Sequence, residues 1–174
     1  MKKNLERRQR RKEPVTVDEI NAVLGAAWGD HRVYGIRDTC VIFLLYGFGF
    51  RDQQLALLRL EDYNEQTGLL TIRSPKRSVV QLSPTAQFIM DRWIKVRGNA
   101  AGWLINPIRR PDKIIPKVLS RGALWGVLVR RIQEAGITPF SPDDIVCTHN
   151  LITRGVWDRS FNDELPSEQI SADY

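Results

Sequence analysis

At 174 residues, with 26 Lys and Arg against 20 Asp and Glu, the chain is long enough for one domain with its own core, and its formal charge is +6. Its longest apolar stretch, residues 40–50, is too short to cross a bilayer, and no apolar segment follows the basic N-terminus as it would in a secretory signal. Two cysteines without a spacing motif predict two free thiols, so we expect a cytoplasmic protein with no membrane partner.

Charge is strongly segregated along the chain. Residues 1–13 hold seven Lys or Arg against two Glu, and residues 73–131 hold thirteen basic side chains against two acidic ones. Residues 14–72 and 132–174 are net acidic. Basic charge gathered in a tail and in one contiguous segment is typical of a surface that binds a polyanion, and we favour nucleic acid over a merely solvated surface.

The first elements follow from capping and apolar spacing. Residues 1–13 are expected to be disordered without a partner, which leaves residues 14–174 as the folded domain. A capping box at Thr16 and Glu19 predicts a helix through about Trp28. Apolar periodicity predicts further helices at about residues 37–46 and 52–58.

The next segment is expected to contain a small sheet. After a turn at residues 64–68, strands are predicted at 69–73 and 78–82, joined by the basic tip Ser74-Pro75-Lys76-Arg77. Ser83-Pro84 then predicts the start of a helix that ends near Gly98, and residues 106–117 read as a loop rich in proline and basic residues.

Three more helices are expected toward the C-terminus. They are predicted at residues 120–135, from residue 141 onward and from residue 165 onward. The predicted fold class is therefore mainly α with a small antiparallel β-sheet (α+β).

Arg51 is the first candidate site residue. An apolar helical run ends in the glycine-punctuated turn Gly47-Phe48-Gly49-Phe50, which presents Arg51 before a second leucine-rich helix. An arginine between two core helices needs an anionic partner, and a planar guanidinium suits a phosphate. The alternative is a structural ion pair with Asp52 or Glu61.

Three stretches in this order resemble the catalytic domain of the tyrosine recombinases, the phage integrase family. Residues 46–62 are similar to the first active-site box of that family, and residues 70–84 to its hairpin and the start of the next helix. Residues 148–154 resemble its second box, and residues 165–171 resemble the helix before its terminal Leu-Gly-His motif.

The resemblance implies a set of catalytic roles. In the family a tyrosine attacks a DNA phosphodiester, two arginines and a histidine hold the phosphoryl oxygens, and a hairpin lysine protonates the leaving oxygen. Arg51 matches the first arginine and His149 the box histidine. The lysine position falls on Arg73, whose guanidinium is a poor proton donor, so Lys76 is an alternative donor or a contact to the DNA backbone. The resemblance implies neither a metal nor another cofactor.

The sequence departs from the family where the second arginine belongs. That position is Ile152, and Arg154 would point roughly 200° away around a helix. Another register, which aligns residues 141–146 with the box, places Asp143 and Val146 at the histidine and arginine positions. In either register the second phosphate clamp is missing.

The chain also ends before the Leu-Gly-His motif and the nucleophile segment. Tyr174 is interpreted as a helix residue, and we expect no separate N-terminal DNA-clamping domain. We therefore predict a degenerate, C-terminally truncated recombinase domain that binds double-stranded DNA, modulates an active relative or remains from a mobile element, and does not cleave DNA unaided. The expected DNA contacts are exposed basic side chains, namely Arg73, Lys76, Arg77, Arg109, Arg110, Lys113, Lys117 and Arg121.

Two alternatives remain open. The chain could be a fragment or protomer of an active site-specific recombinase, with the nucleophile supplied by another protomer. It could instead be a protein-interaction module that regulates a recombinase or associates with itself through an exposed apolar patch.

Overall fold

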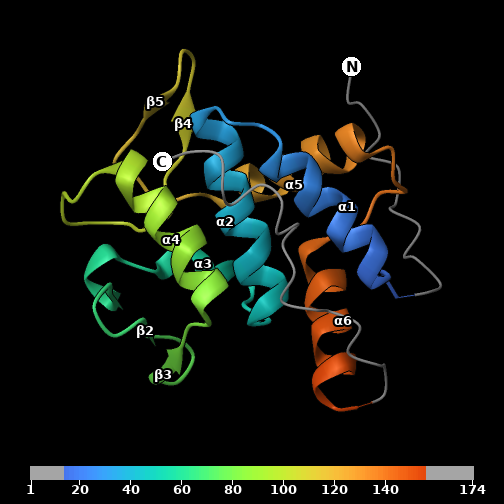
Figure 1. Ribbon diagram of the computed structural model, residues 1–174, viewed down its shortest axis with the longest axis horizontal. Coiled ribbons are helices and arrows are strands. Elements are labelled where there is room, and N and C mark those ends of the chain that lie inside the picture. Colours follow the sequence, from blue (N-terminus) through green and yellow to red (C-terminus); the bar gives the residue numbers. More distant parts are fainter. Residues whose placement is uncertain (1–13, 156–174) are drawn as a thin grey trace, which may run out of the picture.

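The computed structural model describes residues 14–155. The expected basic tail and the expected final helix with Tyr174 lie outside these residues. The described part is mostly helical with small antiparallel sheets, which confirms the predicted α+β class (Figure 1). Its α-helices are α1 Val17–Trp28, α2 Val33–Gly47, α3 Asp52–Leu57, α4 Pro84–Arg97, α5 Arg121–Ala135 and α6 Pro142–Thr153.

Helix α2 is the centre of the fold. Every residue from Arg37 to Tyr46 is buried, and the helix packs against α1, α4 and α6. It begins at Val33, about a turn earlier than the sequence predicted. Asp30 Oδ1 accepts a hydrogen bond from the backbone N of Arg32, the N-cap residue of α2, at 3.2 Å. This contact fixes the chain at the start of the helix, ahead of the apolar residues on which the prediction was based.

The early sheet has one strand more than predicted. After a 3-10 turn at Leu60–Asp62, β1 (Tyr63–Asn64) pairs antiparallel with β2 (Leu69–Ile72), which pairs antiparallel with β3 (Ser78–Gln81). The expected strand pair is therefore confirmed, and the two-residue β1 was too short to show a pattern.

The segment 106–117 was wrongly predicted as a loop without strands. It contains the hairpin of β4 (Ile108–Arg109) and β5 (Lys113–Ile114), in which Ile108 pairs with Ile114. Each strand has two residues, so apolar alternation had no length over which to appear.

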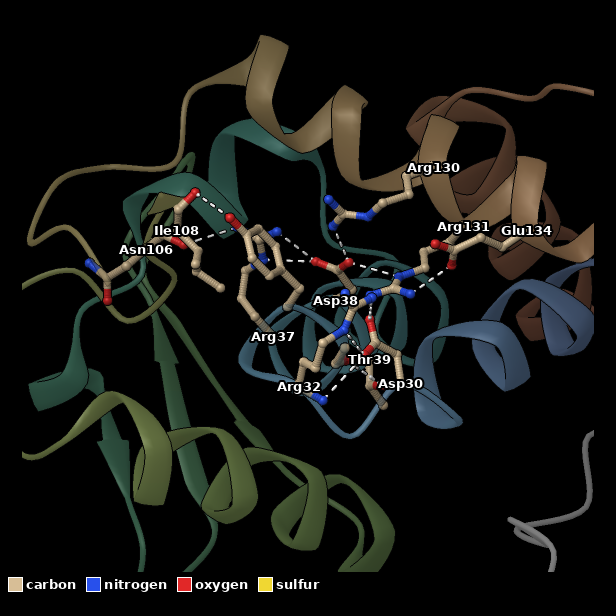
Figure 2. A network of polar contacts seen from close by, with 12 residues as sticks. Asp30, Arg32, Arg37, Asp38, Thr39, Asn106, Ile108, Arg130, Arg131 and Glu134 are labelled. Carbon is tan, nitrogen blue, oxygen red and sulfur yellow. Dashed lines mark hydrogen bonds and ion pairs between the residues drawn. The ribbon is translucent and has the colours of Figure 1, made fainter. Parts of the chain in front are cut away.

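A buried polar network ties α2 to α5 (Figure 2). The fully buried Asp38 binds Arg37 through Oδ1 at 2.7 Å, and its Oδ2 binds Arg131 at 2.8 Å and also Arg130. Arg131 in turn binds Asp30 at 2.8 Å, which adds the turn between α1 and α2. Because carboxylates pair with these guanidinium groups, the network is a structural clamp and not an open anion site.

Both cysteines are free, as predicted, with Cys40 buried and Cys147 exposed. Burial in the core raises the pKa of the Cys40 thiol to about 12. Within residues 14–155 no helix is long and apolar enough to cross a membrane.

Candidate nucleic-acid interface

Arg51 is exposed at the amino end of α3, and not enclosed between core helices as the sequence suggested. The proposed structural partners are engaged elsewhere: Asp52 binds Arg121 at 2.6 Å, and Glu61 binds Arg59 at 3.5 Å. Among residues 14–155 no carboxylate forms an ion pair with the Arg51 guanidinium. The charge of Arg51 is therefore accessible to an external anion.

His149 lies on α6 and contacts the turn that carries Arg51. Its Nδ1 is 2.6 Å from the Tyr46 carbonyl oxygen. A carbonyl can only accept a hydrogen bond, so Nδ1 carries the proton, and in the neutral imidazole Nε2 is the acceptor. The ring also fills the space above Gly49, where an added Cβ would be 2.4 Å from His149 Cδ2 and where φ is +63°. The structure thus brings His149 to the Arg51 turn.

Gln54 connects Arg51 to the β2–β3 turn. Its Oε1 accepts a hydrogen bond from the Arg51 backbone N at 2.9 Å, and its Nε2 donates to the Ser74 carbonyl at 3.0 Å. One side chain therefore fixes the start of α3 against the basic turn that holds Lys76 and Arg77.

Arg73 is held by a buried carboxylate. Arg73 Nε donates to Asp62 Oδ1 at 2.7 Å, and the other oxygen of Asp62 accepts from the Arg59 backbone N at 2.9 Å. The hydrogen bond with Asp62 raises the pKa of Arg73 above its ordinary value. A guanidinium in this state can bind an anion but does not release a proton.

Helix α6 offers no second arginine in either register of the box. Ile152 is 9% exposed and Val146 is 8% exposed, so both positions hold aliphatic side chains in the core. Arg154 is exposed at the end of the helix, and Asp143 is exposed in its first turn.

The basic segment is contiguous in sequence but divided in space. Lys76 and Arg77 are exposed in the β2–β3 turn, near the carboxyl end of α2. The β4–β5 hairpin lies at the other end of α2, where Tyr34 Oη donates to the Ile108 carbonyl at 3.4 Å (Figure 1). The hairpin region carries four of the expected DNA contacts, all exposed: Arg109, Arg110, Lys113 and Lys117. Helix α2, whose 15 residues give it a length of about 22 Å, runs between the two groups.

Arg121 belongs to the first group and not to the hairpin. It is the first residue of α5, and its guanidinium forms an ion pair with Asp52, the residue that follows Arg51. No sequence pattern indicated this contact, because the two partners belong to helices that are far apart along the chain.

Sequence reasoning missed Asp52, Asp62 and Gln54 as residues that organise the site. Gln54 follows Arg51 by three residues, the spacing at which a Gln side chain accepts from an N-cap backbone N, so that signal was present. The roles of the two aspartates depend on contacts between distant segments. No group of three His, Cys, Asp or Glu side chains within residues 14–155 could hold a metal ion.

No protein-family model matches the chain. Among curated proteins it is similar to the tyrosine recombinases XerA of Pyrococcus horikoshii, with 29% identity over 82% of this chain and 48% of the relative, and XerA of Pyrococcus furiosus, with 31% identity over 70% and 43%. It is also similar to the tyrosine recombinase XerD of Listeria innocua, with 26% identity over 90% of this chain and 54% of the relative.

The fold is similar to a crystal structure of XerA recombinase, with a TM-score of 0.65 and 17% identity over 83% of this chain and 52% of that chain. The chain spans about half the length of the curated relatives that it matches.

Proposed function

Because this chain belongs to the tyrosine recombinase family, we propose that it binds the backbone of double-stranded DNA through the Arg51 face and does not transfer strands unaided. The observation that carries the proposal is the contrast between the two arginine positions. Arg51 is exposed and has no carboxylate partner among the described residues, whereas α6 buries an aliphatic side chain at the second position in either register.

The chemistry explains why one missing cation matters. Negative charge develops on the oxygens of the phosphoryl group during transfer, and fixed cationic donors stabilise that charge. Groups that act as a unit do not retain proportional activity when one is removed. Binding depends on the number of phosphates contacted and therefore tolerates the loss much better than catalysis does.

The remaining site residues have roles consistent with binding. Arg51 and Arg73 supply guanidinium groups, Lys76 supplies an ammonium group at the hairpin turn, and His149 presents an imidazole against the Arg51 turn. We propose contacts to the DNA backbone for all four. The two free thiols fit a reducing compartment, and we place the protein in the cytoplasm.

Titration of a fluorescent duplex of about 20 base pairs with the 174-residue protein at low salt tests the proposal. We expect an increase in anisotropy that declines steeply as salt is added. Arg51→Gln should weaken binding, and the control Arg154→Gln at the end of α6 should weaken it less. No binding at low salt by the unmodified protein would contradict the proposal.

An active recombinase protomer is the second candidate, and the placement of His149 against the Arg51 turn favours it. A nicked suicide duplex distinguishes the two. We expect only reversible binding. A covalent protein–DNA adduct that resists denaturant would instead support strand transfer by an active recombinase.

A further inference from the structure

We propose that Arg121 supplies the second guanidinium of the Arg51 site and contacts the same DNA phosphate as Arg51. The inference rests on the proposed DNA binding. It adds Arg121 on α5 to the binding residues and states that two arginines hold one phosphate. It assigns to α5 a role that the sequence resemblance places on α6.

The first observation is the position of Arg121. Its Nε lies 2.6 Å from Asp52 Oδ2, and Asp52 directly follows Arg51. The ion pair therefore anchors a guanidinium from α5 within one residue of the candidate phosphate contact. The Arg121 side chain as a whole is 80% exposed, so it is accessible to an external anion.

The second observation is that Asp52 is itself fixed. Its Oδ1 accepts a hydrogen bond from the Gln53 backbone N at 2.7 Å, while Oδ2 faces Arg121. The carboxylate side chain is only 16% exposed. Asp52 thus acts as a positioning residue, because the first turn of α3 fixes one carboxylate oxygen while the other binds Arg121.

The third observation concerns charge. An ion pair whose cation is largely exposed contributes little to stability, so its main effect here is to fix the position of the Arg121 guanidinium. Asp52 cancels one positive charge, and Arg51 and Arg121 together leave the edge cationic. Two planar guanidinium groups can hold different oxygens of one phosphate, which is the arrangement that α6 cannot provide, because both of its candidate positions are aliphatic.

The number of phosphates that the protein neutralises can be measured from salt dependence. For double-stranded DNA, the slope of log K against log salt concentration changes by about 0.9 for each phosphate that the protein no longer neutralises. We would measure this slope on the same duplex for the full chain, for Arg51→Gln, for Arg121→Gln and for the double variant.

If both arginines hold one phosphate, each single variant should keep nearly the original slope and bind severalfold more weakly, because the other arginine still neutralises that phosphate. The slope of the double variant should then be smaller by about 0.9. Arg109→Gln combined with Arg51→Gln is the control pair, and its slope changes should add because the hairpin lies at the other end of α2.

Asp52→Asn separates positioning from charge. If Asp52 acted only through its negative charge, Asp52→Asn would simply strengthen DNA binding. If Asp52 positions Arg121, Asp52→Asn releases Arg121 from the shared phosphate. Adding Arg51→Gln to Asp52→Asn should then reduce the slope by about 0.9. Circular dichroism of each variant verifies the fold.

Two results would overturn the inference. Slope changes that add between Arg51→Gln and Arg121→Gln, with DNA binding by the unmodified protein intact, would assign separate phosphates and leave the proposed function standing. Absence of binding by the unmodified protein would overturn the inference and the proposed function together.

Discussion

At the scale of single residues, the Gln54 side chain connects two segments of the candidate site. It bonds the backbone N of Arg51 and the carbonyl of Ser74, so its removal frees both the start of α3 and the β2–β3 turn. We expect Gln54→Ala to lower the free energy of unfolding by about 1–2 kcal/mol, as measured by urea denaturation.

Gln53→Ala is the matched control, because Gln53 is exposed on the same turn and its side chain makes no hydrogen bond within residues 14–155. It should change the unfolding free energy by less than about 0.5 kcal/mol. Equal effects of the two variants would show that Gln54 does not link the two segments.

Asp30 makes stability depend on pH. Hydrogen bonds from Arg32, and then from Arg131, outweigh its burial and hold the pKa of the Asp30 carboxyl well below its unfolded value of 3.8. A lowered folded pKa means that the stabilisation is complete above the unfolded pKa and disappears as pH falls toward the folded one. In urea denaturation, the contribution of Asp30 should be nearly constant between about pH 6 and about pH 5 and should fall as the pH decreases from about 5 to about 2.

Asp30→Asn should flatten that profile, since the variant has no carboxyl to protonate at this position. A profile equally steep in the variant would assign the acid sensitivity to other carboxyls. The same experiment separates the contribution of Asp30 from that of Glu61, whose pKa is also lowered.

At this scale the sequence predicted residue types better than it predicted partners. His149 approaches the turn that carries Arg51, but Arg51 is exposed and not enclosed between core helices as the sequence suggested. The partner of Asp52 did not follow from sequence, because Arg121 is remote along the chain and apolar periodicity carries no information on which surface charges meet.

At the scale of elements, the α2–α3 turn depends on a glycine. Gly49 has a φ of +63°, and an added Cβ would be 2.4 Å from the ring of His149. Gly49→Ala should therefore strain the backbone and displace the imidazole, lowering the free energy of unfolding by about 1–3 kcal/mol. Thermal and urea denaturation measure the effect.

Gly126→Ala in α5 is the opposite control. An added Cβ at Gly126 meets nothing within 4 Å, and alanine is the better helix former, so this variant should gain about 0.5–1 kcal/mol. A neutral Gly49→Ala would mean that α6 can shift away from the turn at no cost.

Elements with caps and long apolar faces were predicted well, and very short elements were not. The capping box of Thr16 and Glu19 opens α1 as expected, with the Glu19 backbone N bonded to Thr16 Oγ1 at 3.2 Å. The β4–β5 hairpin was missed because a two-residue strand has no measurable period. Its shape instead depends on pairing across a turn in which Asp112 has a φ of 51°.

At the scale of the whole molecule, Asp38 joins α2 to α5 and, through Arg131, to the α1–α2 turn (Figure 2). Asp38→Asn would leave buried guanidinium groups without their shared carboxylate and should cost about 3–5 kcal/mol of unfolding free energy. Glu134→Gln, at the partly exposed edge of the same network, should cost less than about 1 kcal/mol. Similar losses of unfolding free energy in both variants would show that burial of Asp38 does not determine how much the network contributes to stability.

The division of basic charge between the two ends of α2 sets the footprint on DNA. Helix α2 is about 22 Å long and lies between the β4–β5 hairpin, with Arg109 and Arg110, and the Arg51 end. That length exceeds the reach of an arginine side chain and the Debye length in physiological salt. The two ends should therefore contact different phosphates and contribute independently to affinity.

Duplex length turns that separation into a measurement. One end needs only a few base pairs. If α2 lies along the duplex, engagement of both ends spans about 22 Å of its axis, or about 7 base pairs at about 3.4 Å each. We expect Arg109→Gln with Arg110→Gln to weaken binding to a duplex of about 20 base pairs and to reduce its salt slope by up to about 1.8, with little effect on a stem–loop duplex of about 4 base pairs, which spans only about 14 Å. Equal effects on both duplexes would mean that one continuous surface binds DNA. If the β4–β5 hairpin is a separate surface, its arginines cannot contact a short duplex that is bound at the Arg51 end.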